Sequence, residues 1–300
     1  MIACIDIGGT AIKVGVLDLQ GKIVEKTSLE VNHDFNGLIN SLVSFVEEAK
    51  QQYKVTGVSI SSPGAVDSKT GMVNGSSAIP CIHGHNWKKI MGEATNLPIS
   101  IENDANCAAL AEVFNGSGQS FSDVLFLVCG TGLGGAIIHD GKIHHGKNLH
   151  GGEFGYMLME ERDGEFYNFS NVASTMSFVR KARAHFQDDS YDGIKVFEEA
   201  TKGNEFCQNI LDRFYLNLAK GIFNMQYFYD PEIILIGGAI SQREDFIEKI
   251  NEKIDYLLEK IEIAKVKPVL GACTHKGDAN LIGALANFIS EHQSNNLESK

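Results

Sequence analysis

The sequence predicts an α/β protein built from two similar halves. A hairpin with a glycine-rich turn occurs twice between apolar strands, once around residues 6–10 and once around residues 130–135. After each hairpin the chain makes another tight turn and begins a further strand, at residues 21–24 in one copy and 141–144 in the other. A repeated unit of this kind indicates duplicated halves. Helical and strand patterns alternate elsewhere, which indicates mixed sheets with helical crossovers.

The first half begins with a meander of three strands, residues 2–7, 11–17 and 23–29, because apolar runs are separated there by short glycine-containing turns. Apolar side chains at helical spacing then predict a helix across residues 38–46. The rest of this half reads as a strand, a turn, a loop, a helix, a strand and a helix, over residues 55–61, 62–64, 67–86, 87–95, 98–101 and 104–114.

Residues 115–118 are small and polar and separate the two hairpins, so we expect a hinge between an N-terminal lobe, 1–115, and a C-terminal lobe, 116–277. The second half holds the repeated meander and a long helix that stops at Asp230-Pro231. The elements expected there are a long helix, a strand, a glycine turn, a charged amphipathic helix and a closing helix, at residues 205–228, 233–236, 237–238, 245–261 and 278–290.

Composition excludes several classes of protein. The 300 residues suffice for two domains, and 43% hydrophobic with 21% charged residues is typical of a globular protein. A net charge of −12 without a local basic patch argues against nucleic-acid binding. The longest apolar runs are strand-length, and the chain enters a strand at its start, so we expect a cytoplasmic protein without a membrane span. Six scattered cysteines with no Cys-x-x-Cys pair indicate neither a disulfide framework nor a cysteine zinc site.

The two glycine turns are candidate phosphate sites. Without a Cβ, backbone N–H groups can converge on an anion, and two facing turns could hold a chain of phosphates. Ordinary hairpin turns are the alternative for either copy alone, but the matched pair with nearby hydroxyls and a lysine favours phosphate binding. The candidates are Gly8, Gly9, Thr10, Lys13, Thr131 and Gly132.

The second turn also fits a dinucleotide fingerprint, Gly130-x-Gly132-x-x-Gly135. That site requires a helix to open at the third glycine. Residues 136–139 are β-like instead, so a nicotinamide site is not expected.

Six motifs occur in the order and spacing of the ROK family, which is named for repressors, open reading frames and kinases. The motifs are Asp6-Ile7-Gly8-Gly9-Thr10, Ser62-Pro63-Gly64, Glu102-Asn103-Asp104, Gly130-Thr131-Gly132-x-Gly134-Gly135, Gly152-Glu153-x-Gly155 and Gly237-Gly238. The resemblance spans residues 1 to about 288. The chain thus resembles bacterial sugar kinases of the actin-like, ribonuclease-H-like fold. The resemblance implies two similar lobes closing over ATP and a hexose in the cleft between them. It also implies a homodimer and a last helix, about 278–292, packed on the first lobe.

The Glu102-Asn103-Asp104 motif is the candidate catalytic segment. It lies where a strand passes into a helix, and α/β folds place ligands at the carboxyl ends of strands. Phosphoryl transfer to an alcohol needs a group that orients the hydroxyl and accepts its proton, which a carboxylate can do. By resemblance Asp104 is that base and Asn103 holds sugar hydroxyls. Helix capping is the alternative role, but capping requires only one of these two residues.

The resemblance assigns the other site residues. Ser62, Pro63, Gly64, His150 and Glu153 would contact the sugar. Asp6 would bind Mg²⁺, with or without an intervening water, since magnesium takes only one or two protein carboxylates. Gly237 and Gly238 would let the backbone approach the adenosine of ATP, although simple turn chemistry could also explain them.

Departures from the family pattern suggest the substrate. Many ROK kinases carry Glu-x-Gly-His followed by a cysteine zinc loop, whereas this chain has Glu153-Phe154-Gly155-Tyr156 and no cysteine across residues 163–172. We therefore expect no structural zinc. The Gly-Glu-Phe-Gly-Tyr-Met segment resembles that of β-glucoside kinases, which phosphorylate the 6-hydroxyl of a glucosyl unit in disaccharides such as cellobiose and gentiobiose. A glucokinase and an N-acetylmannosamine kinase are the alternatives within this class.

The histidines at 144, 145 and 150 fit no standard zinc spacing, so a metal centre there is not expected.

A repressor and a sugar sensor are the two alternatives to the kinase from other functional classes. A ROK repressor would need a winged helix-turn-helix ahead of Asp6, where only five residues precede it. A non-catalytic sugar sensor or regulator would lack the base, yet Asp104 is present.

Overall fold

The computed structural model describes residues 1–294, with side chains to residue 292. These residues divide into two compact units. The first unit comprises Met1–Gln119, His145–Gly151 and the chain from Gly277 onward, and the second comprises Ser120–His144 and Gly152–Lys276. The segment 145–151 therefore belongs to the first unit, although it lies within the sequence range of the expected second lobe.

The first unit is built on a five-stranded mixed sheet. Its strands β1 (Ile2–Ile7), β2 (Ile12–Leu17) and β3 (Ile23–Leu29) are antiparallel, and β4 (Gly57–Ser62) and β8 (Ile99–Asn103) run parallel to β1. The strand order is β3-β2-β1-β4-β8. Every residue of β1 and β4 is buried, as expected for strands covered on both faces.

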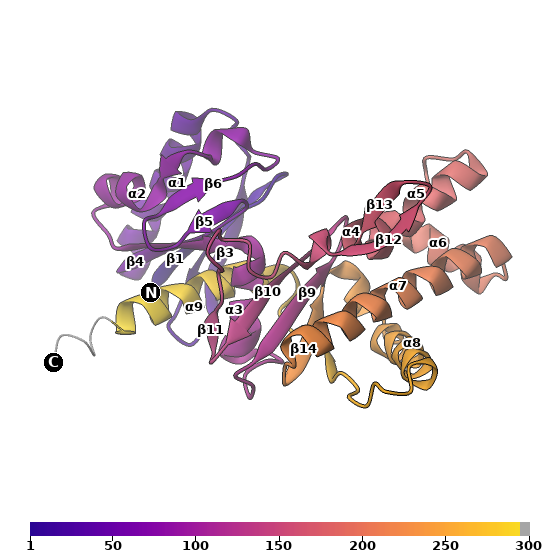
Figure 1. The fold of residues 1–300 in the computed structure, drawn as a ribbon. Helices are drawn as coiled ribbons and strands as arrows, with labels where there is room; N and C mark the ends of the chain where they lie inside the picture. The colour runs from indigo at the N-terminus through magenta and orange to yellow at the C-terminus, as the bar shows by residue number, and fades with distance from the viewer. Residues whose placement is uncertain (295–300) are drawn as a thin grey trace. The chain divides into compact units, whose positions relative to one another are not determined.

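Helices cover both faces of this sheet. The helices α1 (Phe35–Tyr53) and α2 (Trp87–Thr95) share a hydrophobic core with one face, and α3 (Asp104–Asn115) and α9 (Ala279–Ser294) share a second core with the other. Figure 1 shows α9, in yellow, lying along α3. A Cβ at Gly283 would lie 1.7 Å from the carbonyl oxygen of Cys107, so glycine is required where α9 crosses α3.

The prediction that residues 67–86 form only a loop is wrong. This segment is partly β-structure. It contributes to a small three-stranded sheet of β5 (Ala65–Asp67), β6 (Met72–Asn74) and β7 (His85–Asn86). Strands of two or three residues are too short to display an alternating pattern, so their sequence reads as a loop.

The segment 115–118, where a hinge was expected, ends α3. The backbone N–H groups of Gly116 and Gly118 both donate to the carbonyl oxygen of Glu112, and the N–H of Ser117 donates to the Glu112 carboxylate at 3.0 Å. The boundary between the units follows at Gln119.

The second unit repeats the sheet of the first. Its strands are β9 (Val124–Cys129), β10 (Leu133–His139), β11 (Lys142–Ile143), β14 (Ile233–Gly237) and β15 (Leu270–Ala272), in the order β11-β10-β9-β14-β15. Again three strands are antiparallel and two are parallel to the first. The predicted duplication of an α/β unit is confirmed. Because the strand β10 follows the second glycine turn, the dinucleotide reading is excluded.

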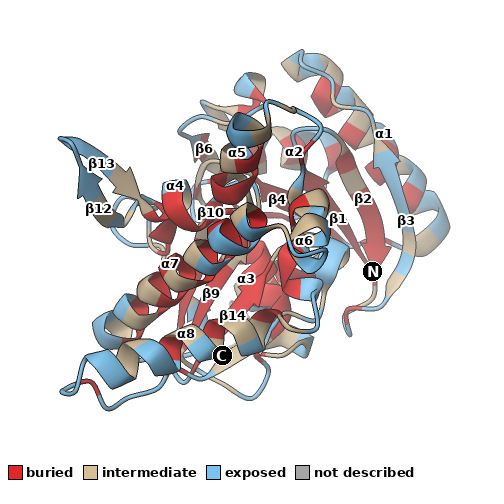
Figure 2. Ribbon diagram, turned by 90° about the vertical axis from the view of Figure 1, so that its right-hand side faces the viewer, coloured by how far each residue is buried: buried red, intermediate tan, exposed pale blue. Residues whose placement is uncertain are grey.

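Two predicted helices pack on the second sheet. The helix α7 (Glu205–Tyr229) begins at Asn204, whose side chain accepts from the N–H of Cys207, and it ends at Asp230 in a left-handed conformation, just before Pro231. The helix α8 (Phe246–Lys260) packs against it. Figure 2 shows both helices with buried residues on one side and exposed residues on the other, as their amphipathic sequences indicate.

Several elements of the second unit were not predicted. They are the hairpin of β12 (Leu158–Arg162) and β13 (Glu165–Asn168) and three short helices, α4 (Phe169–Ala173), α5 (Thr175–Phe186) and α6 (Gly193–Thr201). Among the described residues, no helix has the length and apolar character needed to cross a bilayer.

Candidate active site

The carboxyl ends of three neighbouring strands in the first unit bring together three of the predicted motifs. In the sheet register Asp6 of β1 lies opposite Ser61 of β4, and Ser62 lies opposite Asn103 of β8. Asp104 follows as the first residue of α3. Ligands of α/β folds bind at such an edge.

Asp6 is held firmly at this edge. It is 6% exposed, and its Oδ1 accepts hydrogen bonds from Ser61 Oγ at 3.1 Å and Asn280 Nδ2 at 2.9 Å. Its Oδ2 lies 3.7 Å from Lys13 Nζ, which also donates to the carbonyl oxygen of Gly277. Neutral donors thus fix one oxygen, and a cation accompanies the other.

A single fixed carboxylate suits magnesium that keeps most of its waters and its nucleotide ligands. In the described part of the chain, no three His, Cys, Asp or Glu side chains converge to form a protein cage for a metal. Asp6 therefore fits an ion that the nucleotide brings with it.

The first glycine turn needs glycine for space. A Cβ at Gly8 would lie 2.8 Å from the carbonyl oxygen of Ala11, and one at Gly9 would lie 3.0 Å from the Cβ of Ala78. Neither glycine has a positive φ, so the turn does not use the left-handed region that glycine permits. Thr10 is exposed at the tip. The turn leaves its tip open to solvent, as a phosphate site requires.

Asn103 and Asp104 begin α3. Asn103 caps the helix, because its Oδ1 accepts from the N–H groups of Ala105 at 2.9 Å and Asn106 at 3.2 Å. Its Nδ2 donates to the carbonyl oxygen of Gly64 at 3.1 Å. The capping alternative therefore holds for Asn103, while Asp104 is half-buried in the first turn, where the helix dipole favours a negative charge.

The Ser62-Pro63-Gly64 turn lies beside this cap. Gly64 has φ +105°, and a Cβ there would lie 2.8 Å from the carbonyl oxygen of Asn74, so both conformation and space require glycine. The buried Ser62 hydroxyl donates to the carbonyl oxygen of Pro63 at 3.2 Å. The hydrogen bond from Asn103 to Gly64 fastens this turn to the start of α3.

Glu102, directly before Asn103, is almost completely buried, with 1% exposure. Its Oε1 accepts from the N–H of Asn103 at 2.8 Å and from Asn106 Nδ2 at 2.9 Å, and its Oε2 lies 2.7 Å from His145 Nε2. The hydrogen bond and charge of Glu102 raise the pKa of His145 despite partial burial. The sequence motif contained Glu102, but nothing in it indicated the contact with His145.

His150 and Glu153 have open surroundings. His150, in the first unit, is exposed, and its Nδ1 lies 2.6 Å from the carbonyl oxygen of Asn148. Glu153, in the second unit, is exposed and precedes a short helical turn, Phe154–Tyr156. Tyr156 is 71% exposed. These side chains are free of the protein core and accessible to a ligand.

The second glycine turn joins β9 to β10. The N–H of Gly130 donates to the carbonyl oxygen of Gly132 at 3.0 Å, and the carbonyl oxygen of Gly130 accepts from the N–H of Thr175. Thr131 and Gly132 are exposed. The turn is thereby tied to the start of α5 and presents its tip to solvent.

Gly237 is the last residue of β14, and Gly238 follows it beside the last residue of β9, Cys129. Gly238 has φ +99°, and a Cβ there would lie 2.1 Å from the carbonyl oxygen of Cys129. The Gly238 carbonyl oxygen accepts from both the N–H and the hydroxyl of Ser241. Only glycine allows β14 to continue into the short helix η3 (Ala239–Gln242) beside the end of β9.

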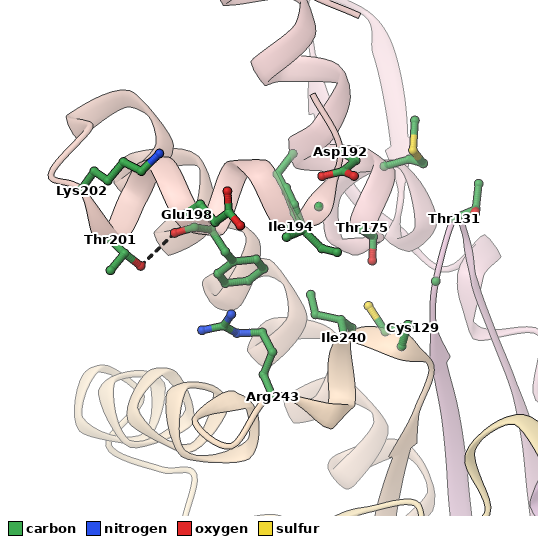
Figure 3. A pocket seen from close by; sticks show the side chains of 16 residues that line it. Cys129, Thr131, Thr175, Asp192, Ile194, Glu198, Thr201, Lys202, Ile240 and Arg243 are labelled. Carbon is green, nitrogen blue, oxygen red and sulfur yellow. Dashed lines mark hydrogen bonds between the residues drawn. The ribbon is translucent and has the colours of Figure 1, made fainter. Parts of the chain in front are cut away.

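A cavity of about 770 Å³ opens beside these glycines, within the second unit (Figure 3). Its walls come from four separate segments, the β9 turn, α5, α6 and the stretch around η3. Its residues are Cys129, Gly130, Thr131, Thr175, Met176, Phe178, Asp192, Gly193, Ile194, Phe197, Glu198, Thr201, Lys202, Ala239, Ile240 and Arg243.

The cavity combines apolar walls with polar groups at its rim. The Arg243 guanidinium lies 3.9 Å from the centre of the Phe197 ring and forms an ion pair with Asp245 at 3.1 Å. Figure 3 shows Ile194 and Ile240 on opposite walls. Such a lining suits a flat, partly polar ring such as a nucleobase.

The sequence predicted only the turn residues of this cavity. Of the predicted nucleotide residues, Thr131 lies in its wall, and Gly237 and Gly238 directly precede the lining residue Ala239. No sequence motif indicated the residues that α5 and α6 contribute.

Comparison with known proteins identifies the family. The sequence profile of the ROK family matches residues 2–291. The chain belongs to the ROK family. The beta-glucoside kinase of Listeria monocytogenes is 34% identical over 298 residues, which cover 97% of this chain and 98% of that protein.

Solved structures of the ROK family share the fold. A ROK family protein from Streptococcus pneumoniae, in complex with sucrose, is 38% identical with a TM-score of 0.91, covering 98% of this chain and 99% of that one. A ROK family glucokinase from Streptomyces griseus, in complex with glucose and AMPPNP, is 26% identical with a TM-score of 0.75, covering 95% and 97%. The family resemblance and the fold class predicted from the motifs are confirmed.

Proposed function

We propose that this ROK protein is an ATP-dependent kinase that phosphorylates the 6-hydroxyl of the glucosyl unit in a β-glucoside such as cellobiose or gentiobiose. The similarity to the Listeria beta-glucoside kinase over 97% of the chain carries this proposal. The Gly-Glu-Phe-Gly-Tyr-Met segment at residues 152–157 supports it. The sucrose complex of the streptococcal neighbour supports a disaccharide ligand but not the β linkage, because sucrose is an α-glucoside.

The sugar would be held mainly at the strand edge of the first unit. Asn103 retains a second amide hydrogen for a sugar hydroxyl, because its cap uses the oxygen and Gly64 takes one hydrogen. Ser62, Pro63 and Gly64 form the adjacent turn. His150 and Glu153, both exposed, complete the proposed set of sugar ligands.

Asp104 would act as the general base. It accepts the proton of the 6-hydroxyl as that oxygen bonds to the γ-phosphorus of ATP, while the bond to the β,γ-bridging oxygen breaks and ADP leaves. The start of α3 favours the ionised carboxylate that this step needs.

The base of the nucleotide would lie in the cavity of the second unit. Its phosphates would accept hydrogen bonds from the backbone N–H groups of the glycine turns. The residues assigned to ATP are Gly8, Gly9, Thr10, Lys13, Thr131, Gly132, Gly237 and Gly238. Asp6 would hold Mg²⁺ directly or through water, and the ion would neutralise phosphate charge.

We further propose that the lobes 1–115, with the helix at about 278–292, and 116–277 close on the substrates about residues 115–118. Closure would exclude water that could otherwise hydrolyse ATP. A homodimer in the cytoplasm is proposed from the family resemblance.

A substrate panel tests the proposal. Turnover with ATP is measured for cellobiose, gentiobiose, sucrose, glucose and N-acetylmannosamine. We expect the highest kcat/KM for cellobiose or gentiobiose, because Glu153-Phe154-Gly155-Tyr156 resembles the segment of β-glucoside kinases and not the Glu-x-Gly-His of many ROK kinases. A strong preference for glucose or N-acetylmannosamine would reject glucoside specificity but retain a sugar kinase. Sugar binding without any turnover would favour the sensor.

A further inference from the structure

A buried carboxylate next to the proposed base depends on one histidine. Glu102 is 1% exposed and receives three donors. Two of them, the Asn103 N–H and Asn106 Nδ2, share Oε1, and both come from the junction of β8 with α3. The donor to Oε2 is His145 Nε2, at 2.7 Å.

His145 begins the segment 145–151, which belongs to the first unit while the residues on either side belong to the second. Its ring is 31% exposed and also lies 3.4 Å from Ser68 Oγ. The Gly151 N–H donates to the His145 carbonyl oxygen at 2.9 Å. The residue therefore fixes both ends of a short loop that carries His150.

We propose that His145 is a positioning residue of the sugar site, whose donation to Glu102 holds the segment 145–151 against the junction where Asn103 and Asp104 begin α3. The inference rests on the proposed function, because the sugar roles of Asn103, Asp104 and His150 are assigned there. His145 itself needs no contact with the sugar.

Removal of the imidazole would leave a buried carboxylate oxygen without its charged donor. Such an oxygen must recruit water or turn toward solvent, which disturbs the hydrogen bonds made by the other oxygen. In Glu102 the other oxygen accepts from the backbone N–H of Asn103 and from Asn106 Nδ2. The effect should therefore reach the side-chain amide of Asn103, the proposed sugar ligand, through the backbone of that residue.

The charge of His145 depends on pH in a defined direction. The Glu102 hydrogen bond and charge raise the pKa of the imidazole, Asp67 raises it further, and burial and Lys69 lower it. The imidazole is charged below this raised pKa, and its charged contact with Glu102 gives way to a neutral hydrogen bond as pH rises through it. Sugar affinity in the wild-type protein should therefore weaken toward alkaline pH.

Four proteins test the inference: wild type, His145→Ala, His145→Gln and the control His144→Ala, which alters the exposed neighbouring histidine. Calorimetry gives the Kd for cellobiose, and kinetics give KM and kcat. We expect His145→Ala to weaken cellobiose binding about tenfold, within the range for a buried charged acceptor that loses its partner. His145→Gln retains a neutral N–H donor near Nε2, as wild-type His145 does above its pKa, so its Kd should match the alkaline wild-type value and not change with pH.

An independent readout is the titration of His145 followed by NMR. The pKa of its imidazole should be raised in the wild type and should fall in Glu102→Gln, because the amide cannot stabilise the imidazolium. Unchanged sugar affinity in His145→Ala, or a His145 titration that is insensitive to Glu102→Gln, would overturn the inference.

The two proposals fail differently. A wild-type protein that binds cellobiose without phosphorylating it refutes the kinase, while weaker binding in His145→Ala still supports the positioning role. A kinase whose Kd and KM are unchanged in His145→Ala refutes the positioning role alone. Absence of any sugar binding by the wild type overturns both.

Discussion

Asn103 and Asp104 are adjacent in sequence, yet the structure gives them different surroundings. Asn103 caps α3 with its oxygen and fastens the Gly64 turn with its nitrogen. Asp104 is the first residue of the helix, where its charge is favoured, and its Oδ1 accepts from the N–H of Ala105 at 2.9 Å. The sequence indicated that one residue would cap and one would be left over, but not which. That assignment depends on the register of β8, whose last residue is Asn103.

Gly238 is the residue at which glycine matters most in the second unit. Its φ is +99°, and a Cβ at this position would lie 2.1 Å from the carbonyl oxygen of Cys129. Both the backbone conformation and the lack of space therefore require glycine. We expect Gly238→Ala to lower the free energy of unfolding by about 2–4 kcal/mol, from backbone strain and overpacking combined. Chemical denaturation monitored by circular dichroism measures the change.

Gly203→Ala is the matched control for that substitution. Gly203 has a similar φ of +94°, but no atom lies within 4 Å of a Cβ there. Gly203→Ala should lower the free energy of unfolding only through backbone strain, by about 1–2 kcal/mol. Equal losses for the two variants would show that the approach of Cys129 does not decide the need for glycine at 238.

At the scale of elements, length did not decide what was predicted, because α2, with 9 residues, was predicted and α5, with 12, was not. The long helices α7 and α8 were predicted nearly to their ends, because their apolar spacing and caps are local signals. The short helices α5 and α6 were missed. The cavity could not be predicted, since its walls come from four segments that only the fold brings together.

The helix α6 supplies a direct test of the cavity. Ile194 lines it yet is 71% exposed, so a polar replacement should not harm folding. We expect Ile194→Asp to raise the KM for ATP about tenfold, because an apolar contact with the base is lost and a negative charge is added. The KM for cellobiose should change little. Steady-state kinetics with each substrate varied in turn measure both constants.

Ile263→Asp is the control for this substitution. Ile263 is 91% exposed in the second unit and does not line the cavity. Its KM for ATP should stay within about twofold of wild type. If both variants raise this KM equally, the cavity is not the nucleotide site.

At the scale of the whole molecule, duplication is the organising feature. Each unit has three antiparallel strands followed by two parallel ones, in matching order. The repeated glycine hairpins predicted this arrangement because the first two strands of each sheet are local in sequence. The parallel strand β15 and the membership of segment 145–151 in the first unit were not predictable, since both depend on contacts between residues far apart in the chain.

The candidate active site was also predictable only where local motifs marked its residues. The motifs located Asp6, Ser62 and Asn103, which the parallel register of β1, β4 and β8 places at one edge. No local pattern connected Glu102 to His145, which are separated by 43 positions.

The most direct test of the account is the turnover of cellobiose with ATP by wild type and Asp104→Asn, with the phosphorylated carbon identified by NMR. We expect the wild type to phosphorylate the 6-hydroxyl of the glucosyl unit. Asp104→Asn should lower kcat by about 10²–10⁴-fold, because the proton acceptor is lost, while cellobiose still binds. Asp189→Asn, at an exposed acid of the second unit, should leave kcat unchanged. Undiminished turnover in Asp104→Asn would contradict the proposed mechanism.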